Sequence, residues 1–212
     1  MQSNFDAIRP AKNERGIVIG RTGCGKTTLT RYLLNDAKKP YCVIYDAKGM
    51  INWQEFTLCR SLNECYDCES KKILYQPSFE DTLDLTQQSE FFYWIYNRYY
   101  TRLYVDEAYS LLGGTNPNRG LLACLSRGRE RGISALVSCQ RPARIPLAAL
   151  SEAENYYIFS VTHPADKQRI EDLTAGRITY EKIEDLKPHE FYYYNSWRDV
   201  VSPKLKLNFF EE

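Results

Sequence analysis

The chain has 212 residues, and its 28 lysines and arginines against 27 aspartates and glutamates give a formal net charge of +1. This balance excludes a protein that binds nucleic acid through a globally basic surface, so any contact with DNA must come from a local patch or from assembled subunits. The length suits one α/β domain, which we expect to span residues 1–212 with a core over about residues 16–195.

The apolar segments and the cysteines indicate in which part of the cell the protein is found. No apolar run approaches membrane-spanning length, and the polar segment Met1–Gly16 lacks the apolar centre of a signal peptide, so we expect an intracellular protein with no membrane span. Among the seven cysteines, only Cys59, Cys65 and Cys68 are spaced in a way that suggests a bridge or a metal. Zinc would need a fourth ligand, and free thiols, a disulfide and a zinc site all stay open for these three.

In chain order, short apolar runs alternate with helical stretches, which is the βαβ pattern of a mostly parallel sheet. The predicted strands are Gly16–Gly20, Tyr41–Asp46, Lys72–Gln76, Arg102–Asp106, Ile133–Gln140, Asn155–Val161 and Glu190–Asn195. The predicted helices are Lys26–Asn35, Gln87–Tyr99, Arg119–Arg131, Pro164–Leu173 and Tyr180–Leu186. The predicted fold class is therefore α/β, with a mostly parallel central sheet flanked by helices.

A glycine-rich loop joins the first predicted strand to the first predicted helix. Glycine lets the chain bend closely enough for several backbone N–H groups to converge on phosphate oxygens. Lys26 would reach the β- and γ-phosphates, and Thr27 would bind Mg²⁺ through its hydroxyl. The residues predicted to bind nucleotide are Gly20, Arg21, Thr22, Gly23, Cys24, Gly25, Lys26, Thr27 and Thr28. This Walker A sequence predicts a single P-loop NTPase domain of the ASCE or RecA-like type, and the Cys24 thiol would make its activity sensitive to oxidation.

The predicted strand Arg102–Asp106 is followed directly by a second carboxylate, Glu107. Successive side chains of an extended chain point in different directions, so Asp106 and Glu107 suit two different tasks. Asp106 can bind Mg²⁺, while Glu107 can polarise the water that attacks the γ-phosphate. Together with the glycine-rich loop, this Walker B sequence predicts a Mg²⁺-dependent ATPase with ATP and Mg²⁺ as cofactors.

Arginines are concentrated between residues 119 and 144. They are Arg119, Arg127, Arg129, Arg131, Arg141 and Arg144, against one acid, Glu130. Gln140 ends the strand in this region and could hydrogen-bond the γ-phosphate or the attacking water, while a guanidinium could neutralise charge on the transferred phosphoryl group. An arginine located away from its own glycine-rich loop would serve a neighbouring subunit. A solvated helix face is the alternative for any one of these arginines.

Four elements resemble the FtsK/HerA superfamily of hexameric DNA-pumping ATPases, and within it the short genome-packaging ATPases of membrane-containing icosahedral viruses. They are Gly20–Thr27, the strand that ends in Tyr45–Gly49, the Walker B sequence Val105–Ala108, and Arg129–Ile133 followed by Ser138–Pro142. The resemblance implies that Arg129 is the arginine finger that acts on a neighbouring subunit, with Arg131 as its rival. It also implies that Gln140 is the polar sensor on the strand between the Walker A and Walker B strands.

The loop after the Walker B sequence is the candidate DNA contact. In motors of this type such a segment can move with nucleotide state toward the central channel. Asn118 would allow close approach to phosphate and Arg119 would supply charge. An ordinary flexible surface connection is the alternative.

We therefore expect an ATP-hydrolysing DNA translocase that assembles as a hexameric ring and pumps double-stranded DNA of any sequence into a preformed capsid. Lys26, Glu107, Gln140 and Arg129 would be catalytic. Its partners would be DNA, further copies of the chain and capsid or portal vertex proteins, and its location would be the cytoplasm of the infected host cell or the virion vertex. The alternatives are a plasmid conjugation or mobilisation ATPase and a nucleotide-switched assembly protein that pumps nothing.

Overall fold

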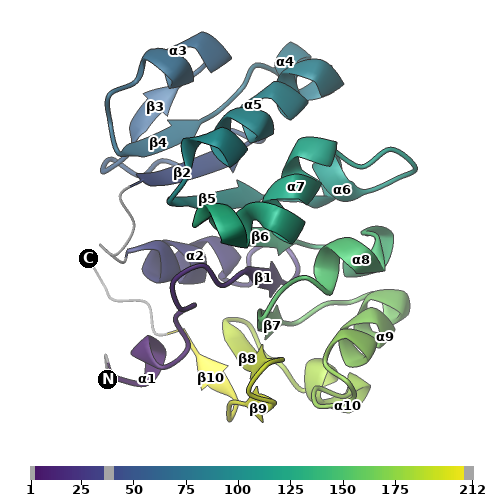
Figure 1. Cartoon of the computed structure of the whole chain (residues 1–212). Coiled ribbons are helices and arrows are strands. Elements are labelled where there is room, and N and C mark those ends of the chain that lie inside the picture. Colours follow the sequence, from purple (N-terminus) through teal and green to yellow (C-terminus); the bar gives the residue numbers. More distant parts are fainter. Residues whose placement is uncertain (1–2, 36–40, 208–212) are drawn as a thin grey trace.

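A single twisted sheet runs through the computed structural model, which describes residues 3–35 and 41–207 (Figure 1). Ten strands in these residues are ordered β10-β8-β7-β1-β6-β5-β2-β4-β3, with β9 paired to β8. Strands β1 (Gly16–Ile19), β2 (Tyr41–Asp46), β3 (Thr57–Cys59), β4 (Lys72–Tyr75), β5 (Thr101–Asp106), β6 (Ser134–Cys139) and β7 (Asn155–Phe159) are parallel. Strand β8 (Glu190–Asn195) runs antiparallel to β7, and β9 (Val200–Val201) and β10 (Leu205–Lys206) run antiparallel to β8.

Helices cover both faces of the sheet (Figure 1). The α-helices are α1 (Ser3–Asp6), α2 (Lys26–Leu34), α3 (Leu62–Asp67), α4 (Phe79–Leu83), α5 (Leu85–Arg98), α6 (Tyr109–Leu112), α7 (Arg119–Arg127), α8 (Leu147–Leu150), α9 (Pro164–Leu173) and α10 (Tyr180–Glu184). Two 3₁₀ turns are η1 (Gly128–Arg131) and η2 (Pro142–Arg144). Within the described residues, none of the helices is both long and apolar enough to cross a membrane.

Two apolar clusters, one on each face, hold the helices to the sheet. Because successive strand residues point to opposite faces, Ile17 of β1 belongs to one cluster and Val18 to the other. Leu29 and Leu33 of α2 pack in the second cluster. Strands buried on both faces read as continuous apolar runs, which is why the sequence pattern predicts the central strands well.

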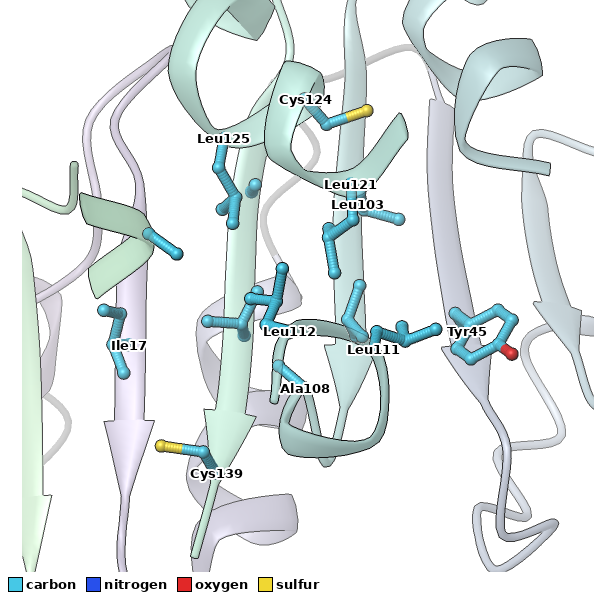
Figure 2. Close-up of a cluster of buried hydrophobic side chains, with 14 of the residues drawn as sticks. Ile17, Tyr45, Leu103, Ala108, Leu111, Leu112, Leu121, Cys124, Leu125 and Cys139 are labelled. Atoms are coloured by element: carbon cyan, nitrogen blue, oxygen red, sulfur yellow. The ribbon is translucent and has the colours of Figure 1, made fainter. Parts of the chain in front are cut away.

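The first cluster extends along the strands to the carboxyl-terminal ends of β5 and β6. Figure 2 shows Leu111 and Leu112 of α6 and Leu121 of α7 directed onto the strands, with Ala108 beside them. All four side chains are buried. Ala108, which follows Asp106 and Glu107, is thus anchored in the core, and the backbone that carries both carboxylates is held in place.

The predicted fold class is confirmed, including the mostly parallel sheet and its flanking helices. The prediction of one helix over Arg119–Arg131 is wrong at its end, because α7 stops at Arg127 and the chain continues as η1. Gly132 follows with φ +72°, a conformation that glycine adopts without strain. The tightened turn brings Arg129 and Arg131 to the start of β6.

A buried ion pair joins the entry of β1 to the entry of β7. Arg15 Nη2 lies 2.7 Å from Glu154 Oε1, and the Arg15 backbone N–H donates to Glu154 Oε2 at 2.7 Å. The side chain of Glu154 is 1% exposed and that of Arg15 is 9% exposed. Removing one partner of such a pair leaves an uncompensated buried charge.

We expect Arg15→Met to lower the free energy of unfolding by about 3–5 kcal/mol, because Glu154 would lose its main cation. Urea denaturation monitored by circular dichroism measures this. The matched control is Arg31→Met, which removes the half-exposed pair of Arg31 with Glu55 and should cost about 1 kcal/mol or less. Equal losses in the two variants would contradict the structural role of Arg15.

Candidate active site

The glycine-rich loop connects β1 to α2 and is tied to both neighbouring strands. The Gly20 backbone N–H donates to the carbonyl of Cys139, the last residue of β6, and the Arg21 N–H donates to the carbonyl of Ser160 after β7, at 3.1 and 3.0 Å. Gly23 and Gly25 have φ values of +75° and +104°. A Cβ at Gly20 would lie 2.6 Å from Cys24 Sγ. Left-handed turns and close approach therefore account for the glycines.

Lys26 opens α2, and Gly25 is the N-cap of this helix. The N–H groups of the first helical turn have no partner within the helix, which makes this terminus a suitable place for phosphate. Lys26 Nζ donates to the carbonyls of Gly20 and Arg21 at 2.8 and 3.0 Å. The ammonium group is thus held against the loop in which the phosphate would bind.

Asp106 and Glu107 lie at the carboxyl-terminal end of β5, which pairs with β6 on the side away from β1. Asp106 Oδ1 accepts hydrogen bonds from Tyr104 Oη at 2.7 Å and Ser138 Oγ at 2.8 Å, which orient the carboxylate. Burial, with Asp106 adding to it, raises the pKa of Tyr104 well above its usual value, so the phenol stays a neutral donor. Glu107 is buried and has φ +54°, an uncommon conformation outside glycine that is found at functional sites.

A chain of hydrogen bonds links the Walker B carboxylate to the glycine-rich loop. The Gln140 backbone N–H donates to Glu107 Oε1 at 3.2 Å, and Thr22 Oγ1 donates to Gln140 Oε1 at 2.9 Å. Strand β6, which carries Gln140 at its tip, lies between β1 and β5. The structure therefore brings together Thr22, Lys26, Asp106, Glu107 and Gln140 at one edge of the sheet.

The donor set at this edge suits Mg²⁺. Thr27 in the first turn of α2 and Asp106 at the end of β5 offer a hydroxyl and a carboxylate, and Mg²⁺ prefers oxygen ligands. Across the described residues there is no group of three or more histidine, cysteine, aspartate or glutamate side chains that could hold a metal. Mg²⁺ is commonly bound through one or two protein ligands together with substrate phosphates.

A cavity of about 350 Å³ opens beside the glycine-rich loop. Its lining includes Arg21, Gln140, Arg141 and His163. Arg141 Nε donates to Asp166 Oδ2 at 2.8 Å, and the Asp166 side chain is 1% exposed. Arg141 is thus fixed at the rim by a buried acid on α9.

Arg129 and Arg131 lie at the opposite end of the sheet from the glycine-rich loop. They precede β6, whereas the loop follows β1, and these two strands are parallel. The six residues of β6 span about 20 Å. Arg129 stacks on the exposed Trp197 ring at 4.2 Å and lies 3.9 Å from Glu154 Oε1. Neither arginine is placed to act on its own glycine-rich loop.

Arg131 is held in a different setting. Its guanidinium lies 4.1 Å from the Tyr96 ring centre and donates to Asn97 Oδ1 at 3.2 Å. It also donates to Tyr99 Oη at 3.2 Å. Arg131 is therefore bound to the end of α5 and the residue after it, whereas half of the Arg129 side chain is exposed.

The two candidate DNA contacts differ in exposure. Asn118 is buried at 4% and caps α7, since its Oδ1 accepts from the Leu121 N–H at 2.9 Å and its Nδ2 donates to Ser89 Oγ at 3.3 Å. Arg119 is exposed, next to a loop that projects from the body of the molecule (Figure 1). A helix cap accounts for Asn118, whereas the Arg119 side chain is open to solvent.

All seven cysteines are free thiols in the structure, and Cys68 alone is only partly buried. Burial raises the pKa of Cys24, and it raises that of Cys59 to about 11. A raised pKa keeps a thiol neutral near pH 7 and slows its reaction. The expected sensitivity of Cys24 to oxidation is therefore corrected to a low reactivity.

We expect iodoacetamide at pH 7.5 to label Cys68 at least about tenfold faster than Cys24 in the folded protein, because only exposed thiols form an accessible thiolate. All seven thiols should react in urea. Peptide mass spectrometry over time measures both rates. Equal labelling of Cys24 and Cys68 in the folded protein would contradict the burial of Cys24.

Several site residues were not predicted. Ser138 is a polar residue that follows three apolar residues of a fully buried strand, which is a signal that its hydroxyl has a task. Trp197 and Glu154 contact Arg129 from distant parts of the chain, and no local pattern marks them. Lys48 faces Glu107 at 3.4 Å, although only the resemblance had drawn attention to its segment.

The strand order, the glycine-rich loop between β1 and α2, and the paired acids after β5 define a P-loop NTPase. No family model matches the chain. The chain is similar to the DNA packaging ATPase P9 of Enterobacteria phage PRD1, with 28% identity over 171 residues that cover 76% of this chain and 70% of P9.

Solved structures share the fold. The genome packaging NTPase B204 of Sulfolobus turreted icosahedral virus 2, in complex with AMPPCP, superposes with a TM-score of 0.76 at 17% identity, covering 92% of this chain and 98% of B204. The pCW3 conjugation coupling protein TcpA has a TM-score of 0.59 at 13% identity, covering 87% of this chain and 58% of TcpA. The resemblance to viral genome-packaging P-loop ATPases is confirmed.

Proposed function

We propose that this protein is the ATPase of a viral genome-packaging motor, which hydrolyses ATP with Mg²⁺ and moves double-stranded DNA into a preformed capsid. The observation that carries the motor proposal is the separation of Arg129 from its own glycine-rich loop by the length of β6. The Arg129 of the next copy of the chain can approach a site that the subunit's own Arg129 does not reach. The similarity to P9 supplies the DNA-packaging context.

In this proposal the whole chain is one ATPase domain, with its core over about residues 16–195, and copies of it form a hexameric ring. The continuity of the sheet from β3 to β10 supports one domain. The motor would act in the cytoplasm of the infected host cell and engage capsid or portal vertex proteins. Base specificity is not required, since DNA of any sequence offers phosphates to Arg119.

The chemistry assigned to each residue follows from its position. Lys26 Nζ would exchange the carbonyls of Gly20 and Arg21 for β- and γ-phosphate oxygens. Glu107 would orient water and accept its proton, while Gln140 reaches from the tip of β6 toward the loop. Mg²⁺, held by Thr27 and Asp106, would neutralise charge on the phosphates. Arg129 of the next subunit would stabilise the phosphoryl group in transfer.

The decisive experiment is Mg²⁺-dependent ATP turnover per subunit across a protein concentration series, with and without linear double-stranded DNA. Turnover that rises steeply with concentration and again with DNA is the expected result. The matched comparison uses single-stranded DNA at equal phosphate concentration. Flat turnover that ignores DNA would contradict the ring motor, and stoichiometric ATP binding with negligible turnover would indicate a nucleotide switch instead.

A further inference from the structure

Lys48 lies in the turn after β2 and faces the Walker B glutamate. Its Nζ is 3.4 Å from Glu107 Oε2, and the two side chains are 48% and 11% exposed. Strands β2 and β5 are direct neighbours in parallel register, with Asp46 opposite Asp106. The pair therefore joins two strand ends that meet at the active-site edge.

A buried carboxylate builds the turn that presents Lys48. Asp46 is fully buried, and its Oδ1 accepts from the Lys48 backbone N–H at 3.1 Å. Its Oδ2 accepts from the Ile51 N–H at 2.7 Å and from Gln76 Nε2 at 2.9 Å. The turn passes through Gly49 at φ +65°. Lys48 is thus attached to a fixed backbone, unlike a typical surface lysine.

Both oxygens of Glu107 are engaged in this arrangement. Oε2 faces Lys48, and Oε1 accepts from the Gln140 N–H at 3.2 Å. A general base must direct an oxygen lone pair at the water whose proton it accepts. Each carboxylate oxygen can accept a second hydrogen bond, so the two partners leave room for water but fix the direction in which Glu107 points. In the resting arrangement Glu107 is held in this orientation.

We propose that Lys48 is a positioning residue that holds Glu107 in this resting arrangement and so restrains ATP turnover. The inference rests on the proposed function, because it assigns a restraint to the base of that same site. Gln140 donates to Glu107 through its backbone N–H at the end of β6, whereas it meets Thr22 through its side chain. A γ-phosphate that draws the Gln140 side chain away from Thr22 therefore leaves the backbone bond to Glu107 in place, and the Lys48 side chain is the partner of Glu107 that can move away.

The test is the steady-state ATPase of Lys48→Met, which keeps the length of the side chain and removes its charge. We expect kcat to rise about two- to fivefold with an unchanged KM for ATP, since a half-exposed ion pair of this kind restrains by a modest amount. Lys48→Arg should restore the wild-type rate. The matched control is Lys71→Met, an exposed lysine before β4 at the opposite end of the sheet, which should leave kcat and the thermal unfolding temperature unchanged.

A fall in kcat, or no change, would overturn the restraint, because Lys48 would then assist Glu107 or do nothing to it. A rise that persists when Glu107→Gln is added would also overturn it, since the extra turnover would bypass Glu107. Failure of the proposed function has a different signature. In that case neither the wild type nor any variant hydrolyses ATP, and both proposals are refuted together.

Discussion

Replacing Glu107 with glutamine is expected to lower ATP turnover by about 10²- to 10⁴-fold, the usual contribution of a positioned general base. The amide has nearly the same shape and can still accept the Gln140 N–H, but it cannot take a proton from water. Nucleotide affinity should stay within about threefold, because Lys26 and the loop are unchanged. Steady-state kinetics and the binding of a fluorescent ATP analogue measure the two quantities.

The matched control for this change is Glu130→Gln, since Glu130 is an exposed acid in η1 at the other end of the sheet. It removes the same charge and should leave turnover within about twofold, as surface substitutions usually do. Thermal unfolding of both variants checks that the fold persists. Turnover of Glu107→Gln close to that of the wild type would remove Glu107 from the catalytic set.

The second large effect is expected for Arg129→Ala, which should reduce turnover by at least about 10²-fold while ATP binding persists, since arginine fingers contribute up to about 10³- to 10⁵-fold. Arg129→Lys should not restore the rate, because an ammonium lacks the planar fork of donors. Arg131→Ala distinguishes the two arginines. A larger loss in Arg131→Ala than in Arg129→Ala would assign the finger to Arg131.

Mixing inactive variants shows where the arginine acts. An assembly of Glu107→Gln and Arg129→Ala subunits contains contacts in which an intact Glu107 meets an intact Arg129 of its neighbour. Turnover should therefore reappear on mixing, although each variant alone is inactive. If no mixture regained activity, the site would be complete within one subunit, against the separation along β6.

Local sequence patterns predict the parts of the site that one short segment encodes. The glycine-rich loop, the acids after β5 and the tip of β6 each follow an apolar strand, and the parallel sheet places strand ends together. The two-residue strands β9 and β10 give no such signal, since alternation cannot be recognised over so few residues. Their positions depend on pairing with β8.

Contacts between distant segments are the part that the sequence does not reveal. Lys48 and Glu107 are 59 residues apart, and only the neighbouring positions of β2 and β5 bring them together. Asn118 illustrates the converse. It follows the loop after the Walker B sequence, where an asparagine suggests a flexible, exposed segment, but the structure buries it as the cap of α7. Burial by the surrounding fold decides such cases.

Strand β7 connects the two functional ends of one subunit. Glu154, which lies near Arg129, immediately precedes it, and Ser160, whose carbonyl receives the Arg21 N–H, immediately follows it. A strand paired on both sides within a sheet is a direct backbone connection between these two ends. In the proposed ring, the nucleotide site of one subunit and the arginine that it offers to its neighbour would thus be joined by a single strand, with no loop between them.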